Sequence, residues 1–108
     1  MEDEADALVP GTQFNATGPI ECTRDRDAPT VSCEAGVVRE GDGMGYIQVF
    51  WPDGGSRVIY YQNNRPHHYD QAEADGGAEM TVAQNGDMFT VFVGEARFVF
   101  PEAFMTGG

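Results

Sequence analysis

The fold is decided by the stretch GYIQVFWPDGGSRVIYYQ, which covers residues 45–62. Its first half alternates, so that Ile47, Val49 and Trp51 lie on one face of an extended strand and the residues between them lie on the other. The tetrapeptide Pro-Asp-Gly-Gly at residues 52–55 is typical of a tight turn. After this turn the apolar residues alternate again. The stretch therefore predicts an antiparallel β-hairpin with one buried face.

Short alternating segments of this kind recur along the chain, and glycine-rich turns separate them. The chain has 14 glycines in 108 residues, about twice the usual share. No segment has a sustained helical period. Strands are predicted at residues 20–23, 30–39, 45–51, 57–62, 80–84, 87–93 and 96–100. The predicted fold class is all-β: a small antiparallel barrel or flattened sandwich of about seven or eight strands.

Some residues predict local detail within this pattern. Gly36 indicates a bulge, because a glycine inside a strand often marks one. Asn85 and Gly86 predict a type I′ turn. Residues 63–66 interrupt the strand pattern. The strand that contains Phe92 is apolar on both faces, which predicts a position at the centre of a sheet or covered on both sides.

The chain length predicts one domain. Residues 1–11 are acidic and end in Pro-Gly, so they are expected to be a disordered terminus. Residues 12–108 then form a single β domain. No apolar run is long enough to span a membrane.

Two cysteines, Cys22 and Cys33, form an isolated pair whose spacing fits neither a CxxC redox motif nor a zinc ribbon. In a small, turn-rich domain such a pair predicts a disulfide, which contributes about 2–4 kcal/mol. A disulfide implies an oxidising compartment, and the protein is therefore expected to be periplasmic or secreted. Acidic residues follow Met1, so we expect the chain to start where a signal peptide was removed.

The charge is strongly acidic, with 18 Asp and Glu residues against 6 basic residues and a formal net charge of -12. All basic residues are arginines. Such a surface repels phosphate, which argues against nucleic acid and anionic lipid as partners. The absence of lysine also excludes Schiff-base chemistry and the Walker phosphate site. The acidity serves solubility or favours a basic protein partner.

The segment His67-His68-Tyr69-Asp70 is the one cluster with metal-ligating side chains close together. In an extended strand His67 and His68 point to opposite faces, and neither face then has a full ligand set. The segment is therefore interpreted as a polar loop, and no metal or cofactor is expected. Neither Ser32 nor Ser56 lies in a nucleophile motif, so the protein is not expected to be an enzyme.

Partner binding is predicted at the acidic segment of residues 70–79 and the aromatic residues beside it. This segment has no compensating base, and loops on a β-scaffold often carry binding surfaces. In the adjacent pairs Phe50-Trp51 and Tyr60-Tyr61, one ring of each pair is expected to point outward. The candidate partner-binding residues are Tyr60, Tyr61, Tyr69, Asp70, Glu73, Asp75 and Glu79.

A series of short motifs runs through residues 14–108. They are Cys22, SCEAGVVR at residues 32–39, PDG at 52–54, RVIY at 57–60, GD at 86–87, VGEARF at 93–98, PEA at 101–103 and the final GG. In these motifs the chain resembles a family of small secreted proteins of Gram-negative bacteria that has no assigned function. This resemblance implies export and the disulfide, and it supplies no activity.

The chain also resembles, more faintly, the periplasmic and membrane-bound inhibitors of C-type lysozyme, which are small disulfide-bearing antiparallel barrels. Tyr69, Gly86 and Ala96 echo their pattern. The inhibitors have a serine before the tyrosine, where this chain has His68, and a lysine beside the glycine, where it has Asn85 and Asp87. These are blocking residues of the inhibitors, so no site is transferred.

Two functions follow as hypotheses from size, charge and the cysteine pair. The first is a non-catalytic periplasmic binding module. The alternative is an acidic inhibitor of a basic cell-wall hydrolase of the lysozyme type.

Overall fold

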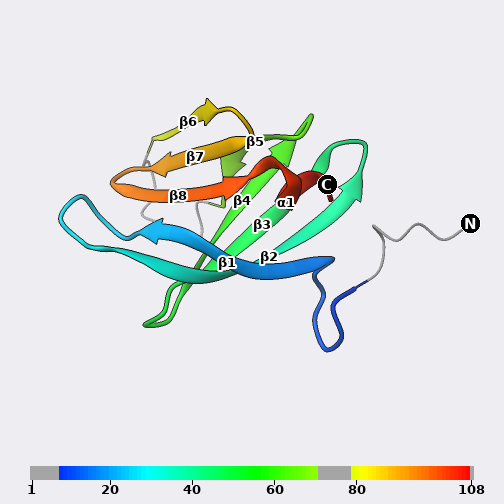
Figure 1. Ribbon diagram of the computed structural model, residues 1–108, viewed down its shortest axis with the longest axis horizontal. Helices are drawn as coiled ribbons and strands as arrows, with labels where there is room; N and C mark the ends of the chain where they lie inside the picture. The colour runs from blue at the N-terminus through cyan, green and yellow to red at the C-terminus, as the bar shows by residue number, and fades with distance from the viewer. Residues whose placement is uncertain (1–7, 71–78, 108) are drawn as a thin grey trace, which may run out of the picture.

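The computed structural model of the protein describes residues 8–70 and 79–107 and contains eight strands and one short helix (Figure 1). The elements are β1 (Ala16–Thr23), β2 (Thr30–Gly41), β3 (Met44–Phe50), β4 (Ser56–Gln62), β5 (Arg65–Tyr69), β6 (Met80–Asn85), β7 (Met88–Val93), β8 (Ala96–Pro101) and α1 (Glu102–Thr106).

All neighbouring strands are antiparallel, and their order in the sheet is β5-β4-β3-β2-β1-β8-β7-β6. Each strand thus pairs with its neighbour in sequence, except β5 and β6, and the first strand, β1, also pairs with the last strand, β8. At the seam between β5 and β6, Arg65 donates a hydrogen bond to Gln84 at 3.4 Å. The result is a nearly closed antiparallel barrel, which confirms the predicted fold class.

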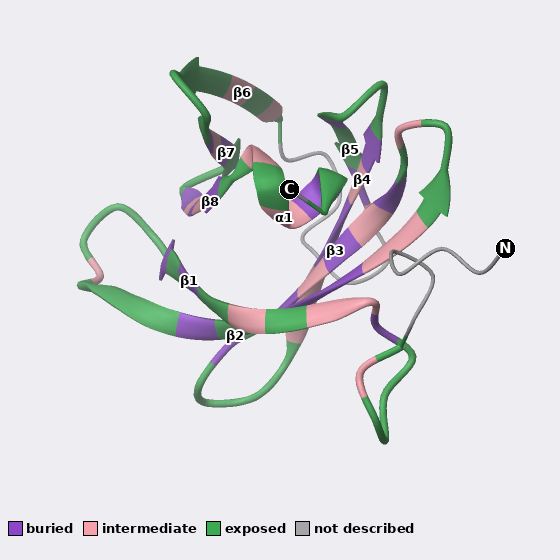
Figure 2. Ribbon diagram, turned by 45° about the vertical axis from the view of Figure 1, so that its right-hand side comes forward, coloured by how far each residue is buried: buried purple, intermediate pink, exposed green. Residues whose placement is uncertain are grey.

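Side chains from alternate positions fill the barrel. In β3, Ile47 and Val49 are fully buried while their neighbours are more exposed, as the alternation predicted (Figure 2). The largest of the fully buried side chains are Phe89, Phe98 and Phe100. An eight-stranded barrel is just wide enough for side chains to fill its interior. The outer surface of the barrel is therefore where recognition has to be sought.

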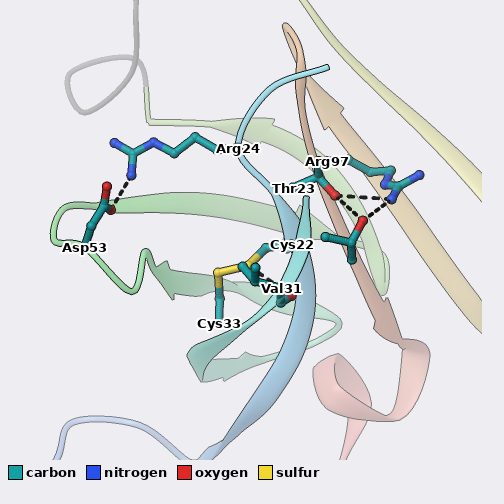
Figure 3. The surroundings of a disulfide bond; sticks show 8 residues. Cys22, Thr23, Arg24, Val31, Cys33, Asp53 and Arg97 are labelled. Carbon is teal, nitrogen blue, oxygen red and sulfur yellow. Dashed lines mark hydrogen bonds and ion pairs between the residues drawn. A yellow bond between two sulfur atoms is a disulfide. The ribbon is translucent and has the colours of Figure 1, made fainter. Parts of the chain in front are cut away.

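The disulfide joins Cys22 on β1 to Cys33 on β2, as predicted (Figure 3). Both residues are 1% exposed, and their Cα atoms are 6.0 Å apart. Cys22 lies opposite Val31 and Cys33 lies opposite Ile20, so the bond runs diagonally across two adjacent strands on their inner face. It locks the register of β1 against β2 from inside the barrel.

The strand β5 corrects the prediction of a polar loop at residues 67–70. Asn63 and Asn64 have φ of 56° and 57°, which are the values that a type I′ hairpin turn requires. The turn returns the chain along β4 as an edge strand. Pro66 is tolerated in it because proline can occupy an edge strand, where no further ladder bond is needed.

The bulge predicted at Gly36 and the turn predicted at Asn85 and Gly86 lie at other positions in the structure. Gly36 is paired regularly with both neighbouring strands, and the irregularity in β2 falls between Arg39 and Gly41. The glycine is needed for another reason: a Cβ atom there would lie 2.4 Å from the ring of Phe14. Asn85 is still paired with Met88, so the turn after β6 consists of residues 86–87.

The end of the chain forms a helix that sequence periodicity did not show. The five residues of α1 are too few for a helical period to be visible. Met105 is buried, and Gly107 ends the helix with φ of 92°. Arg39 donates a hydrogen bond to the carbonyl of Phe104 at 3.0 Å, so the helix is held against the barrel. No helix in the described part of the chain is long and apolar enough to cross a membrane.

β7 is an inner strand of the sheet, as the first of the two predicted alternatives requires, but its outer face is exposed, so it is not covered on both sides. β7 lies between β6 and β8 in the sheet, and Val91 is fully buried. Phe92, which points the other way, is 38% exposed. An apolar side chain at an outward position therefore marks an open surface here.

Candidate functional site

A row of rings crosses three neighbouring strands on the outer surface of the barrel. Tyr46 on β3 lies opposite Tyr60 on β4, and Tyr60 lies opposite His68 on β5. The rings of the two tyrosines are 5.9 Å apart in an edge-to-face arrangement, and Tyr60 stacks on His68 at 4.7 Å. Contacts of this kind stabilise a pair of aromatic rings and favour particular orientations of the two rings. We refer to Tyr46, Tyr60, His67 and His68 as the aromatic row.

His67 joins this row because of a β-bulge. Tyr60 pairs with His68 and Tyr61 pairs with Pro66, so His67 is an extra residue in β5. The extra residue breaks the alternation of the strand, and the Nδ1 atoms of His67 and His68 come to lie 3.0 Å apart. The prediction that these histidines point to opposite faces is therefore wrong.

The histidine pair is a hydrogen-bonded pair of exposed imidazoles. A hydrogen bond between the two Nδ1 atoms requires one of them to donate and the other to accept. Two imidazoles supply two ligands, whereas a structural zinc site uses four. Across residues 8–70 and 79–107, no group of three or more histidine, cysteine, aspartate or glutamate side chains is placed to hold a metal ion.

The segment before β1 extends this surface. Gln13 donates a hydrogen bond to the hydroxyl of Tyr46 at 3.1 Å. Phe14 lies over Gly36, where the missing side chain leaves room for its ring. The ring centroids of Phe14 and the exposed Phe50 are 6.2 Å apart in an edge-to-face arrangement. The aromatic row therefore continues along the outer face of β2 and β3 toward the N-terminal segment.

Of the tyrosines predicted to contact a partner, the structure leaves Tyr60 as the outward ring. Tyr61 and Tyr69 are only 3% and 5% exposed, and both belong to the core. The hydroxyl of Tyr61 donates a hydrogen bond to the carbonyl of Met105 at 3.1 Å. Burial is the main cause that raises the pKa of Tyr61 above its ordinary value of 10.0. The alternation within the pair Tyr60-Tyr61 thus separates a surface ring from a structural one.

The predicted acidic segment begins and ends beside the seam of the barrel. Asp70 is half-buried, and its N–H donates to the carbonyl of Val58 at 2.9 Å. Glu79 is exposed, and its carbonyl accepts the N–H of Gly94 at 2.9 Å. Glu73 and Asp75 lie outside the described residues. Of the acidic residues that can be placed, Asp70 directly follows β5, the strand that carries the histidines, and Glu79 directly precedes β6.

Sequence reasoning missed Tyr46 and the two histidines as surface residues of this site. The outward position of Tyr46 was visible in the alternation of residues 45–51. No local signal predicted the bulge at His67, since it depends on how β5 pairs with β4. No family model, curated protein or solved structure matches the chain. The two resemblances seen in the sequence therefore stay predictions.

Proposed function

We propose that the protein is a non-catalytic binding module of the bacterial cell envelope and that the aromatic row is its contact surface. The observation that carries this proposal is the line of rings across β3, β4 and β5. Aromatic residues dominate the energetics of many protein interfaces, because they bury a large area at a low cost in conformational entropy. The mutual stacking of Tyr60 and His68 reduces that cost further, since the rings are already oriented before a partner binds.

The partner that this surface favours is a basic protein. The chain has a net charge of -12, and Asp70 and Glu79 lie at the two ends of the acidic segment next to β5 and β6. Opposite charge on a partner accelerates the encounter and makes association weaker as salt rises. The rings then supply a packed centre, which long-range charge does not provide.

A more specific version of the function is inhibition of a basic cell-wall hydrolase of the lysozyme type. Its support is the combination of the acidic charge of the chain and a disulfide that belongs to an oxidising compartment. In this version the aromatic row covers part of the hydrolase surface and excludes its substrate.

The experiment compares Tyr60→Ala with Phe92→Ala, two variants that each remove one outward ring from the same barrel. C-type, G-type and I-type lysozymes are titrated with each protein at low and near-physiological salt, and binding and activity are measured. We expect at least one enzyme to bind the unmodified protein, more tightly at low salt. Tyr60→Ala should weaken this binding by about tenfold or more, and Phe92→Ala should leave it within about twofold.

Undiminished activity of all three enzymes at micromolar protein would exclude the lysozyme version. The binding module itself is tested with columns of unmodified protein and of Tyr60→Ala, both loaded with a periplasmic extract. A basic protein that the first column retains and the second releases supports the aromatic row as the contact surface. Identical retention by the two columns contradicts it.

A further inference from the structure

A second row of side chains crosses four other strands on the outer surface. In the register of the sheet, Phe92 on β7 lies opposite Arg97 on β8, Arg97 opposite Thr23 on β1, and Thr23 opposite Thr30 on β2. We refer to these residues as the arginine row. They line a surface hollow of about 480 Å³ together with the loop after β1 and the turn after β7. This volume lies within the range of sites for small ligands.

The guanidinium of Arg97 is held by the two threonines (Figure 3). Its Nη2 atom donates to the hydroxyl oxygen of Thr23 at 3.2 Å and to that of Thr30 at 2.9 Å. The two hydroxyl oxygens are themselves 2.9 Å apart and share a hydrogen bond. Thr23 is 7% exposed, and it is the one buried polar residue in the described part of the chain. The arginine is therefore held in a defined position.

This arrangement leaves donors without acceptors. A guanidinium has five N–H groups, and the two on Nη2 are used by the threonines. The remaining groups, on Nη1 and Nε, have no acceptor among the described residues. The threonine pair uses one O–H between its oxygens, so the second O–H is also available. The hollow thus presents N–H donors of Arg97 and an O–H donor of the threonine pair close together, and a hydrogen-bond acceptor is the ligand group that would use them.

Four charged residues line the hollow: Asp25, Arg26, Glu95 and Arg97. Arg26 forms an ion pair with Glu95 at 3.4 Å. The carboxylate of Asp25 accepts the backbone N–H of Asp27 at 3.0 Å. No carboxylate of residues 8–70 or 79–107 lies within ion-pair distance of Arg97. Arg97 therefore has no ion-pair partner among the described residues, although Asp25 and Glu95 also line the hollow.

We propose that the hollow binds a carboxylate that carries an apolar group. The carboxylate oxygens accept hydrogen bonds from the unused N–H groups of Arg97 and from the free threonine hydroxyl. Charge-assisted bonds of this kind are stronger and shorter than those between neutral groups. The apolar group lies against Phe92, whose ring is 38% exposed at the wall of the hollow. A singly charged ligand is favoured over a phosphate, because the net charge of -12 repels a dianion more strongly.

The carboxylate can belong to a small organic acid or to the C-terminus of a peptide, and the two sources share this chemistry. The probes are benzoate, benzamide, and a tripeptide ending in phenylalanine as its free acid and as its C-terminal amide. Binding to the full chain with its disulfide intact is followed through amide chemical shifts. We expect saturable shifts around Thr23, Thr30 and Arg97 with the acids in the millimolar range, and none with benzamide or the amidated peptide. Tighter binding of the tripeptide acid than of benzoate identifies a peptide terminus as the source, and the reverse identifies a small acid.

The variants Arg97→Gln and Arg65→Gln separate the site from the overall charge. Both remove one positive charge, but Arg65 lies on β5 and contacts Gln84 at the seam. Arg97→Gln should weaken benzoate binding by about tenfold, while Arg65→Gln should leave it within about twofold. Thr30→Val removes a hydroxyl from an exposed position and keeps the branched shape, so it should weaken binding without unfolding the barrel.

Equal losses in Arg97→Gln and Arg65→Gln would mean that only net charge matters, and they would overturn the proposal. The same holds if benzoate gives no saturable shifts, or if Thr30→Val and Arg97→Gln both bind as the unmodified protein does. The site is independent of the aromatic row: Tyr60→Ala should not change benzoate binding, whereas Phe92→Ala should weaken it.

Discussion

The aromatic row and the arginine row are both made of residues that lie opposite one another on paired strands. They differ in the chemistry of their side chains and in the part of the barrel that lies behind them. Both consist of outward residues that lie opposite one another on adjacent strands. The aromatic row crosses β3, β4 and the edge strand β5, whose bulge places His67 next to His68. The arginine row crosses the junction of β1 and β8, directly beside the buried disulfide.

The difference in support predicts a difference in rigidity. Cys22 immediately precedes Thr23 in β1. Phe98, which lies opposite Cys22 in the pairing of β1 with β8, immediately follows Arg97. The arginine row is therefore backed on its inner side by the disulfide and by Phe98, which is fully buried. The aromatic row is backed by Ile47 and Ile59, but its last members lie on a strand that has a ladder partner on one side. One barrel thus offers a firm polar site and a more open apolar surface.

Among the variants that test the difference between the two rows, loss of the disulfide should have the largest effect. Replacing both Cys22 and Cys33 by alanine is expected to destabilise the fold by about 2–4 kcal/mol, because the unfolded chain regains the freedom of the loop. Benzoate binding in the hollow should weaken, while the shifts of the aromatic row at temperatures below unfolding should change little. Thermal unfolding and amide shifts measure the two effects. Two titratable thiols in the native, air-exposed protein would show that the bond is not formed.

A smaller effect is expected from Gly36→Ala, which acts beside the aromatic row, where Phe14 lies over β2. The added Cβ atom would meet the ring of Phe14 at 2.4 Å, so this ring must leave its place. Overpacking of this kind costs about 1–3 kcal/mol. The hydrogen bond from Gln13 to Tyr46 should be lost with it, and the arginine row should be unaffected.

The matched control for this variant is Gly18→Ala. Gly18 also lies in a strand, but a Cβ atom there would meet nothing within 4 Å. Denaturant unfolding should show a clear loss of stability for Gly36→Ala and a change of about 0.5 kcal/mol or less for Gly18→Ala. Equal losses for the two variants would contradict the placement of Phe14 over the sheet.

The smallest effect concerns Tyr61, the inward neighbour of Tyr60. Its pKa is raised chiefly by burial, so the folded state holds the phenolic proton more tightly than the unfolded state does. The stability that depends on this proton is fully present below pH 10.0, the ordinary value, and is lost as the pH rises through the higher folded pKa. The Tyr61→Phe variant has no phenolic proton, so its stability does not fall in this way as the pH rises.

The denaturant midpoint should therefore fall more steeply for the unmodified protein than for Tyr61→Phe above about pH 10. Below that pH, Tyr61→Phe should be less stable by about 1 kcal/mol, because the carbonyl of Met105 loses its hydrogen bond. Parallel curves for the two proteins up to the alkaline limit would contradict a buried, hydrogen-bonded Tyr61. Tyr60→Phe serves as the control, since its ring lies on the outer surface.

The sequence by itself determined the all-β fold, the hairpin at residues 45–62 and the pairing of Cys22 with Cys33. These features depend on local alternation, on turn chemistry and on there being only two cysteines. The alternation also predicted one inward and one outward ring in each of the pairs Phe50-Trp51 and Tyr60-Tyr61, and the structure shows that Trp51 and Tyr61 are the inward rings. Alternation predicts the face of a residue where the strand is regular, and it failed at His67 and His68, where β5 has a bulge.

The tertiary structure alone decided which outward residues meet. The row of Tyr46, Tyr60 and His68 and the row of Phe92, Arg97, Thr23 and Thr30 depend on register between strands that are distant in sequence. The bulge at His67 and the helix α1 were likewise invisible, since both depend on packing against the rest of the barrel. Alternation within a strand shows the face but contains no information about the residue opposite, and both proposed binding surfaces are made of such opposite residues.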